Sequence, residues 1–450
     1  MFQVPKDRKL DAALVQEIID FNEERRKRFD LLDNYYMGKQ RITERVKDDT
    51  RINNKVVINH AKYIVDIATG YLLGNPVDYQ VEENTNIEPL LDAYKAQTME
   101  NIDFELAKEC SIFGIAYEYV YADENADPRS SVLDPRNTII IYDDTIAHNK
   151  VFGINYRGIY EKDKLDHYEI IATTKDEIIT YTLSNRNLKE ISREKHFFGV
   201  VPIVEYDNNK ENLGDFESVI SLIDAYNLIQ SDRVNDREQL VDAILCFYGM
   251  SFDEDQMADL KEKRALSNIP QDGKVEYLTK TINEGDVDVL RKTIEQDIHK
   301  ISMVPNMSDV NFVGNSSGVA IRYKLIAFEQ TTKNKERFFE TSLMQRFEIY
   351  AHYLAVKSKM QEVKKEDVDA VFKRNLPSND FETSQMINNL VGIIDKELLA
   401  AQLSFVDDAS EAVRLAEEQE QETVKDAEYN ANNFGTDVED INVTNMPNEE

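Results

Sequence analysis

IAYEYVYAD, at residues 115–123, marks the point where the pattern of this sequence changes from helix to strand. The same mixture of Ile, Tyr, Val and Thr returns in four short stretches: NTIIIYDD at 137–144, KVFGINYRGI at 150–159, HYEIIATT at 167–174 and EIITYTLS at 177–184. Short runs of this kind, with turn residues between them, are typical of strands that pair in sequence. They predict a mostly antiparallel sheet in this part of the chain.

The residues before this sheet have helical periodicity. Leu14, Ile18 and Phe21 recur at helical spacing. A second helix is predicted within NNKVVINHAKYIVDIATGYLLG at 53–74, and a third from about Thr98 to Phe113. The apolar face of the second helix carries Ile58, Ala61, Val65, Ala68 and Leu72. Helices followed by an antiparallel sheet indicate the α+β class.

The polar residues 208–215 separate the sheet from a second helical region. We expect them to form a flexible linker between modules. The next helix, predicted from Phe216 to Ala243, is apolar in its first half and charged in SDRVNDREQ at 231–239. A helix that is apolar in one half and polar in the other usually passes through two environments.

A loop rich in Asn, Gly and Ser, VPNMSDVNFVGNSSG at 304–318, lies between the helical stretch 287–303 and a long helix predicted from about Val319 to Met360. Loops of this length between helices are uncommon unless they are functional or disordered. Because rigid helices hold both of its ends, the loop is a candidate for presenting a flexible tip to a partner. A plain helix–helix connector is the alternative.

Composition limits the classes of function. The chain has 450 residues, with 53 basic and 85 acidic side chains, so its formal net charge is −32. This balance argues against simple cationic wrapping of DNA, although contacts at a few local places stay open. No signal peptide and no membrane-spanning stretch is evident, and two cysteines cannot make a disulfide framework. We therefore expect synthesis in a reducing cytoplasm.

The sequence offers little catalytic chemistry. Its six histidines are scattered outside any zinc spacing, and it contains no phosphate-binding loop, dinucleotide-binding turn or nucleophile elbow. The best candidate for a Mg²⁺ site is Asp143 with Asp144, with Asp134 or Asp163 near them in sequence. An ordinary turn after a strand is the favoured interpretation in so acidic a chain. We therefore expect no enzyme, although a metal-dependent nuclease or phosphotransferase remains an alternative.

Two further features have an ordinary explanation. The run Arg25 to Arg28 could bind nucleic acid, but it follows Glu23 and Glu24 on a helix, which favours an ion-paired exposed face. His299 lies in an amphipathic helix, where a solvated histidine or one at the edge of the core is favoured over a metal ligand.

Four segments taken together resemble portal proteins of tailed bacteriophages. Residues 53–77 are similar to their wing segment and 217–249, ESVISLIDAYNLIQSDRVNDREQLVDAILCFYG, to the helix that enters their stem. Residues 304–339 are similar to their tunnel loop and the helix behind it, and FKRNLPSND at 372–380 to a short motif that follows. The resemblance extends to about residue 420, in the family's usual order, and points to the branch from phages and prophages of Gram-positive bacteria.

The resemblance implies a portal fold with an α/β wing, a helical stem, a small mixed clip, a tunnel loop and a helical crown. Carried onto this sequence, its parts are the wing at 1–210, stem helices at 216–245 and 287–303, the clip at 246–286, the tunnel loop at 304–318, a long wing helix with a return segment at 319–376, and the crown at 377–420. Residues 407–450 contain 14 acidic and 2 basic side chains, so 421–450 are expected to form an acidic, disordered tail.

The resemblance also implies a function. Portal proteins form a ring of about twelve subunits at one capsid vertex, through which double-stranded DNA is packaged and later ejected. Implied partners are the large subunit of terminase, head-completion or adaptor proteins, and the major capsid and scaffolding proteins. No cofactor, metal or membrane is implied, and the expected location is the virion. A non-portal helical scaffold of the phage head is the alternative, and it predicts no ring.

Candidate site residues follow from the same resemblance and from the local charges. The tunnel loop would offer the channel Asn306, Ser308, Asp309, Asn311, Asn315 and Ser316. The stem carries the cations Arg233, Arg237, Arg291, Lys292 and Lys300, which face either the DNA or the acids Asp232, Asp236 and Glu295 of neighbouring subunits; pairing between subunits is favoured. The partner-facing candidates in the clip are Lys261, Lys263, Arg264 and Lys274.

Overall fold

The computed structural model describes most of the chain. The described residues are 1–48, 52–81, 85–162, 164–185, 187–241, 244–249, 273–278, 284–308, 323–361, 363–374, 380–403, 406 and 409–433. They fall into two compact units, the first made of Met1–Asp309 with Leu325–Asn375 and the second of Val310–Lys324 with Leu376–Glu450. Within these described ranges, no helix has the length and apolar character needed to cross a membrane.

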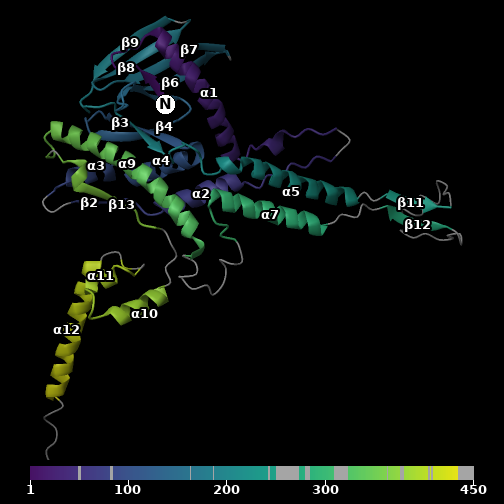
Figure 1. Ribbon diagram of the computed structural model, residues 1–450. Helices are drawn as coiled ribbons and strands as arrows, with labels where there is room; N and C mark the ends of the chain where they lie inside the picture. The colour runs from purple at the N-terminus through teal and green to yellow at the C-terminus, as the bar shows by residue number, and fades with distance from the viewer. Residues whose placement is uncertain are drawn as a thin grey trace, which may run out of the picture. The chain divides into compact units, whose positions relative to one another are not determined.

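A six-stranded sheet forms one layer of the first unit (Figure 1). Its strands, in spatial order, are β1 (Phe2–Val4), β5 (Thr138–Asp143), β6 (Lys150–Glu161), β7 (Lys164–Thr173), β8 (Glu177–Ser184) and β9 (Asn187–Lys195). All neighbours are antiparallel except β1 and β5. Helix α1 (Ala12–Tyr36) covers the sheet with Leu14, Val15, Ile18 and Ile19, which are buried against Ile139 and Ile154.

A smaller sheet belongs to a second layer. Its order is β10 (Ile203–Asp207), β3 (Ile115–Ala122) and β4 (Pro128–Leu133), all antiparallel. Around it pack α2 (His60–Leu73), α3 (Glu88–Lys95), α4 (Met99–Phe113) and the long helix α9 (Ile326–Val356). The α+β class is confirmed. Strands β1, β4, β9 and β10 of these two sheets were not among the predicted ones. Nearly all of β9 is exposed, so it shows no alternation of buried and exposed residues.

The centre of this second core is ionic. Arg346 of α9 is fully buried and pairs with Asp103 of α4, with Glu118 of β3 3.7 Å away. The Arg346 guanidinium also donates to the Tyr79 hydroxyl at 3.0 Å, and the Tyr206 hydroxyl donates to Glu118 at 2.6 Å. Two helices, α4 and α9, and three strands, β2, β3 and β10, are thereby joined by polar contacts as well as by apolar packing.

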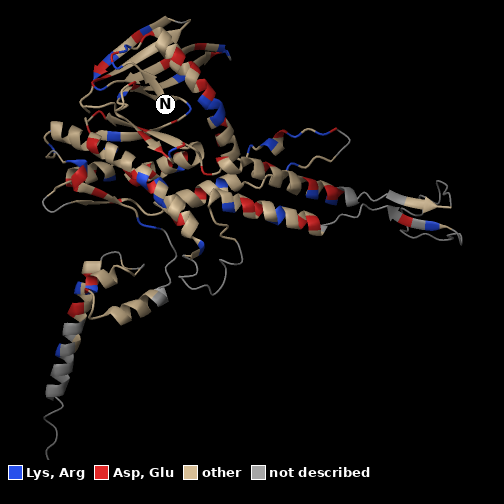
Figure 2. Cartoon of the chain, in the orientation of Figure 1, with Lys and Arg blue, Asp and Glu red and all other residues tan. Residues whose placement is uncertain are grey.

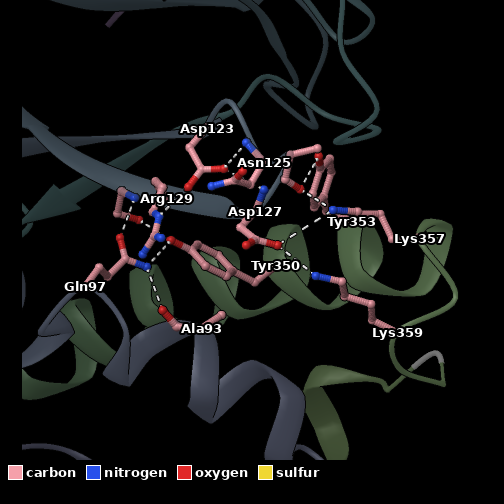
Figure 3. Close-up of polar contacts among 12 residues, drawn as sticks. Ala93, Gln97, Asp123, Asn125, Asp127, Arg129, Tyr350, Tyr353, Lys357 and Lys359 are labelled. Atoms are coloured by element: carbon pink, nitrogen blue, oxygen red, sulfur yellow. Dashed lines mark hydrogen bonds and ion pairs between the residues drawn. The ribbon is translucent and has the colours of Figure 1, made fainter.

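The end of α9 also holds the β3–β4 turn (Figure 3). Asp123 accepts the amides of Asn125 and Asp127 at 2.9 Å, and its second oxygen pairs with Arg129. Lys359, just past α9, reaches Asp127 at 2.7 Å. This acidic turn is therefore neutralised by the chain's own cations.

The expectation of a flexible linker at 208–215 is wrong. Asp215 accepts hydrogen bonds from Ser111 and from Lys335, the latter at 2.6 Å. Gly114 has φ +83°, and a Cβ there would lie 2.1 Å from the Asn212 carbonyl oxygen. Asp215 is therefore bound to α4 and α9, while Lys210 and Glu211 of the same segment are exposed.

The remaining elements of the first unit are a helix pair and two small two-stranded sheets. The pair consists of α5 (Ile220–Val241), preceded by the short helix η2 (Glu217–Val219), and α7 (Glu284–Ser302). Strands β11 (Ile244–Tyr248) and β12 (Lys274–Leu278) are antiparallel, as are β13 (Val368–Val371) and β2 (Asp78–Val81). The short helices η1 (Arg41–Glu44) and η3 (Lys365–Asp367) complete the unit's described elements.

Two predicted helix boundaries in this unit need correction. The helix predicted to reach residue 245 ends at Val241, and Ile244 and Leu245 already pair with Leu278 and Tyr277 in a hairpin. The long helix predicted to reach about Met360 ends at Val356, and its predicted start at 319 lies outside the described residues. Pairing with a distant strand ended the first helix, which local periodicity could not indicate.

The second unit contains α10 (Asp380–Leu390), α11 (Lys396–Ala400) and α12 (Ala409–Asn433). We expected disorder from residue 421, but α12 continues to Asn433, so this part of the prediction is wrong. Arg414 pairs with Glu411 and Glu418 on the same helix face, which supports a helix despite the acidic composition. Residues 434–450 lie outside the described residues.

Candidate functional site

Helices α5 and α7 lie side by side and carry most of the predicted stem residues (Figure 1). Both helices carry acidic and basic residues, and those of α5 gather in its second half (Figure 2). Between them, Leu228, Val234, Val287 and Leu290 line a groove together with Arg233 and other polar residues. The pair therefore has both apolar and charged surface for a partner.

A ladder of buried polar side chains fixes α5 to the rest of the unit. Asn227, Ser231 and Asn235 follow one another at intervals of four residues on one helix face, and all three are buried. Asn227 accepts the amide of Ile58 at 2.8 Å, and Ser231 accepts that of Val56 at 2.9 Å. Asn235 accepts a third amide, that of Asn54, at 2.7 Å.

The spacing of this ladder has a simple cause. Four residues of helix advance about 6.0 Å, and two residues of extended chain advance about 6.6 Å. Every fourth side chain of α5 therefore meets every second amide of residues 54–58. The helix supplies the acceptors that a neighbouring strand would otherwise provide, so these partly buried amides are satisfied.

Ion pairs extend this attachment along α5. Arg45 contacts Asp232 at 2.6 Å, and Lys47 contacts the same carboxylate at 3.5 Å. The Asn54 side-chain amide donates to Glu238 at 2.6 Å. The segment before α2 thus runs beside α5 and neutralises one of its acids.

A cluster of two histidines and two tyrosines fixes α7 at its last turn. The His60 ring of α2 lies edge-on to Tyr226 of α5 at 4.8 Å and to His299 of α7 at 5.6 Å. His299 Nδ1 is 2.9 Å from the Val304 carbonyl oxygen. Tyr63 of α2 packs on His299, donates to the Pro305 carbonyl at 3.2 Å and accepts the Met307 amide at 2.8 Å. The chain leaving α7 is therefore attached to α2 for its first few residues.

Glu295 links this cluster to the cations of α7. It pairs with Arg291 at 2.9 Å and accepts from the Asn306 side-chain amide at 3.0 Å. The Tyr226 hydroxyl lies 3.4 Å from its second oxygen. One carboxylate thus bridges α5, α7 and the segment after α7.

Burial gives His60 a lowered pKa. Desolvation, and after it the proximity of His299, lower the pKa of His60 from 6.5 to about 4, while Glu295 acts in the opposite direction. The folded chain therefore keeps His60 neutral at pH values where the unfolded chain takes up a proton. Stability should fall by about 3 kcal/mol as pH decreases from about 6.5 to about 4.

The variant His60→Gln tests this expectation. It removes the titrating group, so the free energy of unfolding should vary less with pH in that window than it does in the wild type. Urea unfolding at several pH values, followed by circular dichroism, measures the difference. The matched control is His148→Gln at an exposed histidine. Equal pH dependence in wild type and His60→Gln would contradict the assignment.

The predicted stem cations are mostly occupied within the chain. Arg291 pairs with Asp288 and Glu295, and Lys292 with Asp288 at 2.7 Å, all on α7. Arg233 donates to Gln230 at 3.4 Å. Arg233 and Arg237 both line the groove between α5 and α7. Lys300 is exposed in the last turn of α7. Asp232 and Glu295, the predicted acceptors from neighbouring subunits, already have partners in their own chain.

The structure reaches only part of the predicted loop and clip sites. Asn306 and Ser308 are described, and Asn306 accepts the Ser308 amide at 3.0 Å. In the clip, Lys274 of β12 pairs with Glu276 and lies over the Tyr248 ring. The predicted residues that fall outside the described ones are Asp309, Asn311, Asn315, Ser316, Lys261, Lys263 and Arg264.

Asp143 has the role of a turn residue. Its carboxylate accepts hydrogen bonds from Thr145 Oγ1 at 2.6 Å and from both nitrogens of Asn149 at 2.9 Å. These bonds, that of Thr145 first, lower the pKa of Asp143 to about 2. Asp163 lies outside the described residues, and the described part of the chain contains no cluster of three or more His, Cys, Asp or Glu side chains suited to a metal.

The arginine run on α1 is used inside the unit. Arg28 forms a two-pronged pair with Glu217 at 2.6 and 2.7 Å and donates to the Asn212 carbonyl. Arg25 donates to the Tyr117 hydroxyl at 3.3 Å, and Arg26 pairs with Glu23 on its own helix. Only part of the run is the exposed ion-paired face that we predicted.

Sequence reasoning missed the ladder and the histidine–tyrosine cluster. The available signal was the four-residue repeat of Asn227, Ser231 and Asn235, which runs from the apolar half of the helix into the charged stretch 231–239. His299 was expected at the edge of the core, where it lies, but its partner His60 is 239 positions upstream. No local pattern connects the two.

Comparisons with known proteins agree over nearly the whole chain. A family model described as phage portal protein, SPP1 Gp6-like, matches residues 15–425. A portal protein of Bacillus phage SPP1 is 25% identical over 437 residues, covering 91% of this chain and 86% of that protein. A portal protein of Clostridium phage phiCD119 is 23% identical over 466 residues, covering 94% of this chain and 100% of that protein.

Proposed function

The chain belongs to the SPP1 Gp6-like family of phage portal proteins, a structural family, and we propose that α5 and α7 form the stem of its ring and line the path of double-stranded DNA. The chain is a phage portal protein and thus a virion component. The number of subunits, about twelve, is part of the proposal. Synthesis in the host cytoplasm and the later passage of DNA during ejection are also part of the proposal.

The observation that carries this proposal is the attachment of the helix pair. The ladder from Asn227 to Asn235 and the cluster around His60 hold α5 and α7 at two places on the body of the unit. A channel wall has to keep its position while a long polymer slides past it. Buried hydrogen bonds and packed rings supply this rigidity better than an apolar contact between two helices alone.

The charges of the pair suit a wall that does not grip DNA. Every phosphate that a cation neutralises releases counterions and strengthens binding. Arg291 and Lys292 are paired with acids of their own helix, and the chain as a whole has a net charge of −32. Phosphates would therefore meet few unpaired cations on α7, so DNA would be held weakly.

The partners proposed for this chain follow from the portal role. Strands β11 and β12, between α5 and α7, would belong to the clip that meets the large subunit of terminase during packaging and head-completion or adaptor proteins afterwards. The first unit's sheets would meet the major capsid and scaffolding proteins. The segment 304–318 would be the tunnel loop, and residues 377–420 the crown.

The ring is tested by measuring the mass of the purified protein together with negative-stain images. About a dozen subunits of 52.0 kDa around a central hole are expected. Because some portals assemble only with partners, co-expression with capsid and scaffolding proteins is the second arm. A monomer or dimer in both arms would overturn the ring and support a helical scaffold instead.

A deletion within the proposed tunnel loop tests the DNA path. Removing about six residues from 307–314 should leave the ring intact but reduce packaged DNA severely, because the ring would lose its contact with the sliding duplex. The control replaces the same residues by Gly and Ser at unchanged length. Packaged DNA is measured by nuclease protection. Normal packaging in the deletion would show that the loop is only a connector.

A further inference from the structure

A second surface of the first unit has the properties of a docking site, and the proposed path of DNA along α5 and α7 does not account for it. A cavity of about 850 Å³ lies between the six-stranded sheet, the 198–201 segment, α9 and the residues after it. Its cations are Lys6, Lys150, Lys175, Lys364 and Lys365, and we call it the lysine pocket. All its lining residues belong to the first unit.

The charge of the lysine pocket is opposite to that of the chain. Five lysines line it against two acids, Glu348 and Glu366, whereas the whole chain has 53 basic and 85 acidic side chains. Lys365 pairs with Glu348 at 3.2 Å, so one lysine and one acid are mutually occupied. Lys6, Lys175 and Lys364 are exposed at the surface of the unit. The lysine pocket is therefore a cationic site on a chain that is acidic as a whole.

Lys150 gives the pocket a fixed cation at its base. Its ammonium donates to the Ile203 carbonyl and to Gln345 Oε1, both at 3.0 Å. Burial lowers the pKa of Lys150, while Glu205 and Asp207 oppose this effect. An ammonium has three hydrogens, so two neutral acceptors leave one for a further partner. A carboxylate is the acceptor that would best compensate a desolvated cation.

The walls of the pocket are apolar, and the backbone of the 198–201 segment has a constrained conformation. Phe198, Val201 and Ile349 line it, and Val200 is 48% exposed beside the still more exposed Phe197. Gly199 has φ +73°, and a Cβ there would lie 2.8 Å from His352 Nε2. The 198–201 segment therefore passes closely under α9 in a conformation that suits glycine, so the pocket exists before any partner arrives.

We propose that the lysine pocket docks an acidic segment of a partner protein, with carboxylates on the lysines and an apolar side chain against Val200 and Phe198. An apolar patch with a charged rim is the usual anatomy of a protein–protein site. A pocket of this volume accepts a few side chains, whereas the rigid width of a DNA duplex would reach only the outer lysines. The inference does not depend on the assignment of α5 and α7 to the stem, because it concerns the sheet layer and not the helix pair.

The test measures binding of a short fluorescein-labelled peptide of Glu-Glu-Leu repeats to the full chain by fluorescence anisotropy. The variant Lys6→Glu/Lys364→Glu reverses two charges at the pocket, and we expect it to weaken binding at least tenfold. The matched control is Lys164→Glu/Lys189→Glu, at two exposed lysines on strands β7 and β9. This control should change binding less than twofold. Val200→Ser should weaken the Glu-Glu-Leu peptide but not a peptide of Glu-Glu-Ser repeats.

Three results would overturn the proposal. Equal weakening by both lysine pairs would mean general attraction between a cationic surface and an anionic peptide. Tighter binding of a labelled DNA duplex with the same sensitivity to Lys6 and Lys364 would make the surface a nucleic-acid site. Absence of peptide binding at millimolar protein would exclude the site. Thermal unfolding of each variant, followed by circular dichroism, shows that the compared proteins are folded.

Discussion

Replacing Arg346 by leucine is expected to lower the free energy of unfolding by about 3–5 kcal/mol, the range for a buried ion pair that loses one partner. Arg346 is fully buried and pairs with Asp103, while Glu118, also fully buried, lies 3.7 Å away. Leucine would leave both carboxyl groups in the core without a cation. Burial already raises the pKa of Glu118, and Arg346 opposes that rise, so the variant should also protonate Glu118 more readily.

Urea unfolding measures this loss. The chain has 22 tyrosines and no tryptophan, so tyrosine fluorescence and circular dichroism are suitable signals. The matched control is Arg337→Leu at an exposed arginine of the same helix, which should change stability by less than about 0.5 kcal/mol. The conservative variant Arg346→Lys should lose less than Arg346→Leu, because it keeps the charge. A loss below about 1 kcal/mol in Arg346→Leu would show that the pair is dispensable.

The second large effect is expected from the ladder on α5. The variant Asn227→Ala/Ser231→Ala/Asn235→Ala removes the acceptors of the Ile58, Val56 and Asn54 amides. Each buried donor left without an acceptor costs about 1–3 kcal/mol. The 54–58 segment should then separate from α5 more often, and the helix should lose a brace that the proposed channel wall needs.

Hydrogen–deuterium exchange of a peptide covering 52–58 measures this opening. Each 1.4 kcal/mol lost locally should speed exchange about tenfold. A single pair of variants on one helix supplies the control, since Ser231 is buried in the ladder and Ser221 is exposed. Ser231→Ala should speed exchange of the Val56 amide, and Ser221→Ala should not. Unchanged exchange in the triple variant would mean that water replaces the lost acceptors without cost.

The local pattern of apolar and polar residues was sufficient to predict most of the secondary structure. The five predicted strand stretches overlap β3, β5, β6, β7 and β8, and the predicted helices overlap α1, α2, α4, α5 and α7. These segments alternate or recur with the period of their own element because each buries one face. The acidic composition and the missing catalytic motifs pointed away from an enzyme, and the order of four segments indicated the portal family, which the comparisons confirm.

The prediction failed where a partner far along the chain decides the structure. Residues 208–215 look like a solvated linker, but Ser111 of α4 and Lys335 of α9 bind Asp215, and Gly114 packs closely against Asn212. Composition describes what a residue can do in water, and it says nothing of which groups folding brings near. The same reason explains why α5 ends at Val241, where pairing with β12 begins shortly afterwards.

The sequence by itself therefore determined the fold class, most elements and the family, because these depend on periodicity and on the order of segments. Tertiary structure alone decided the ladder on α5, the cluster of His60 with His299, the Arg346 pair and the lysine pocket. Each of these joins groups at least 100 positions apart in the chain. The type of a polar residue does not indicate which residue it will contact. Its role depends on the distance, burial and charge of its neighbours, and only the packed chain sets these.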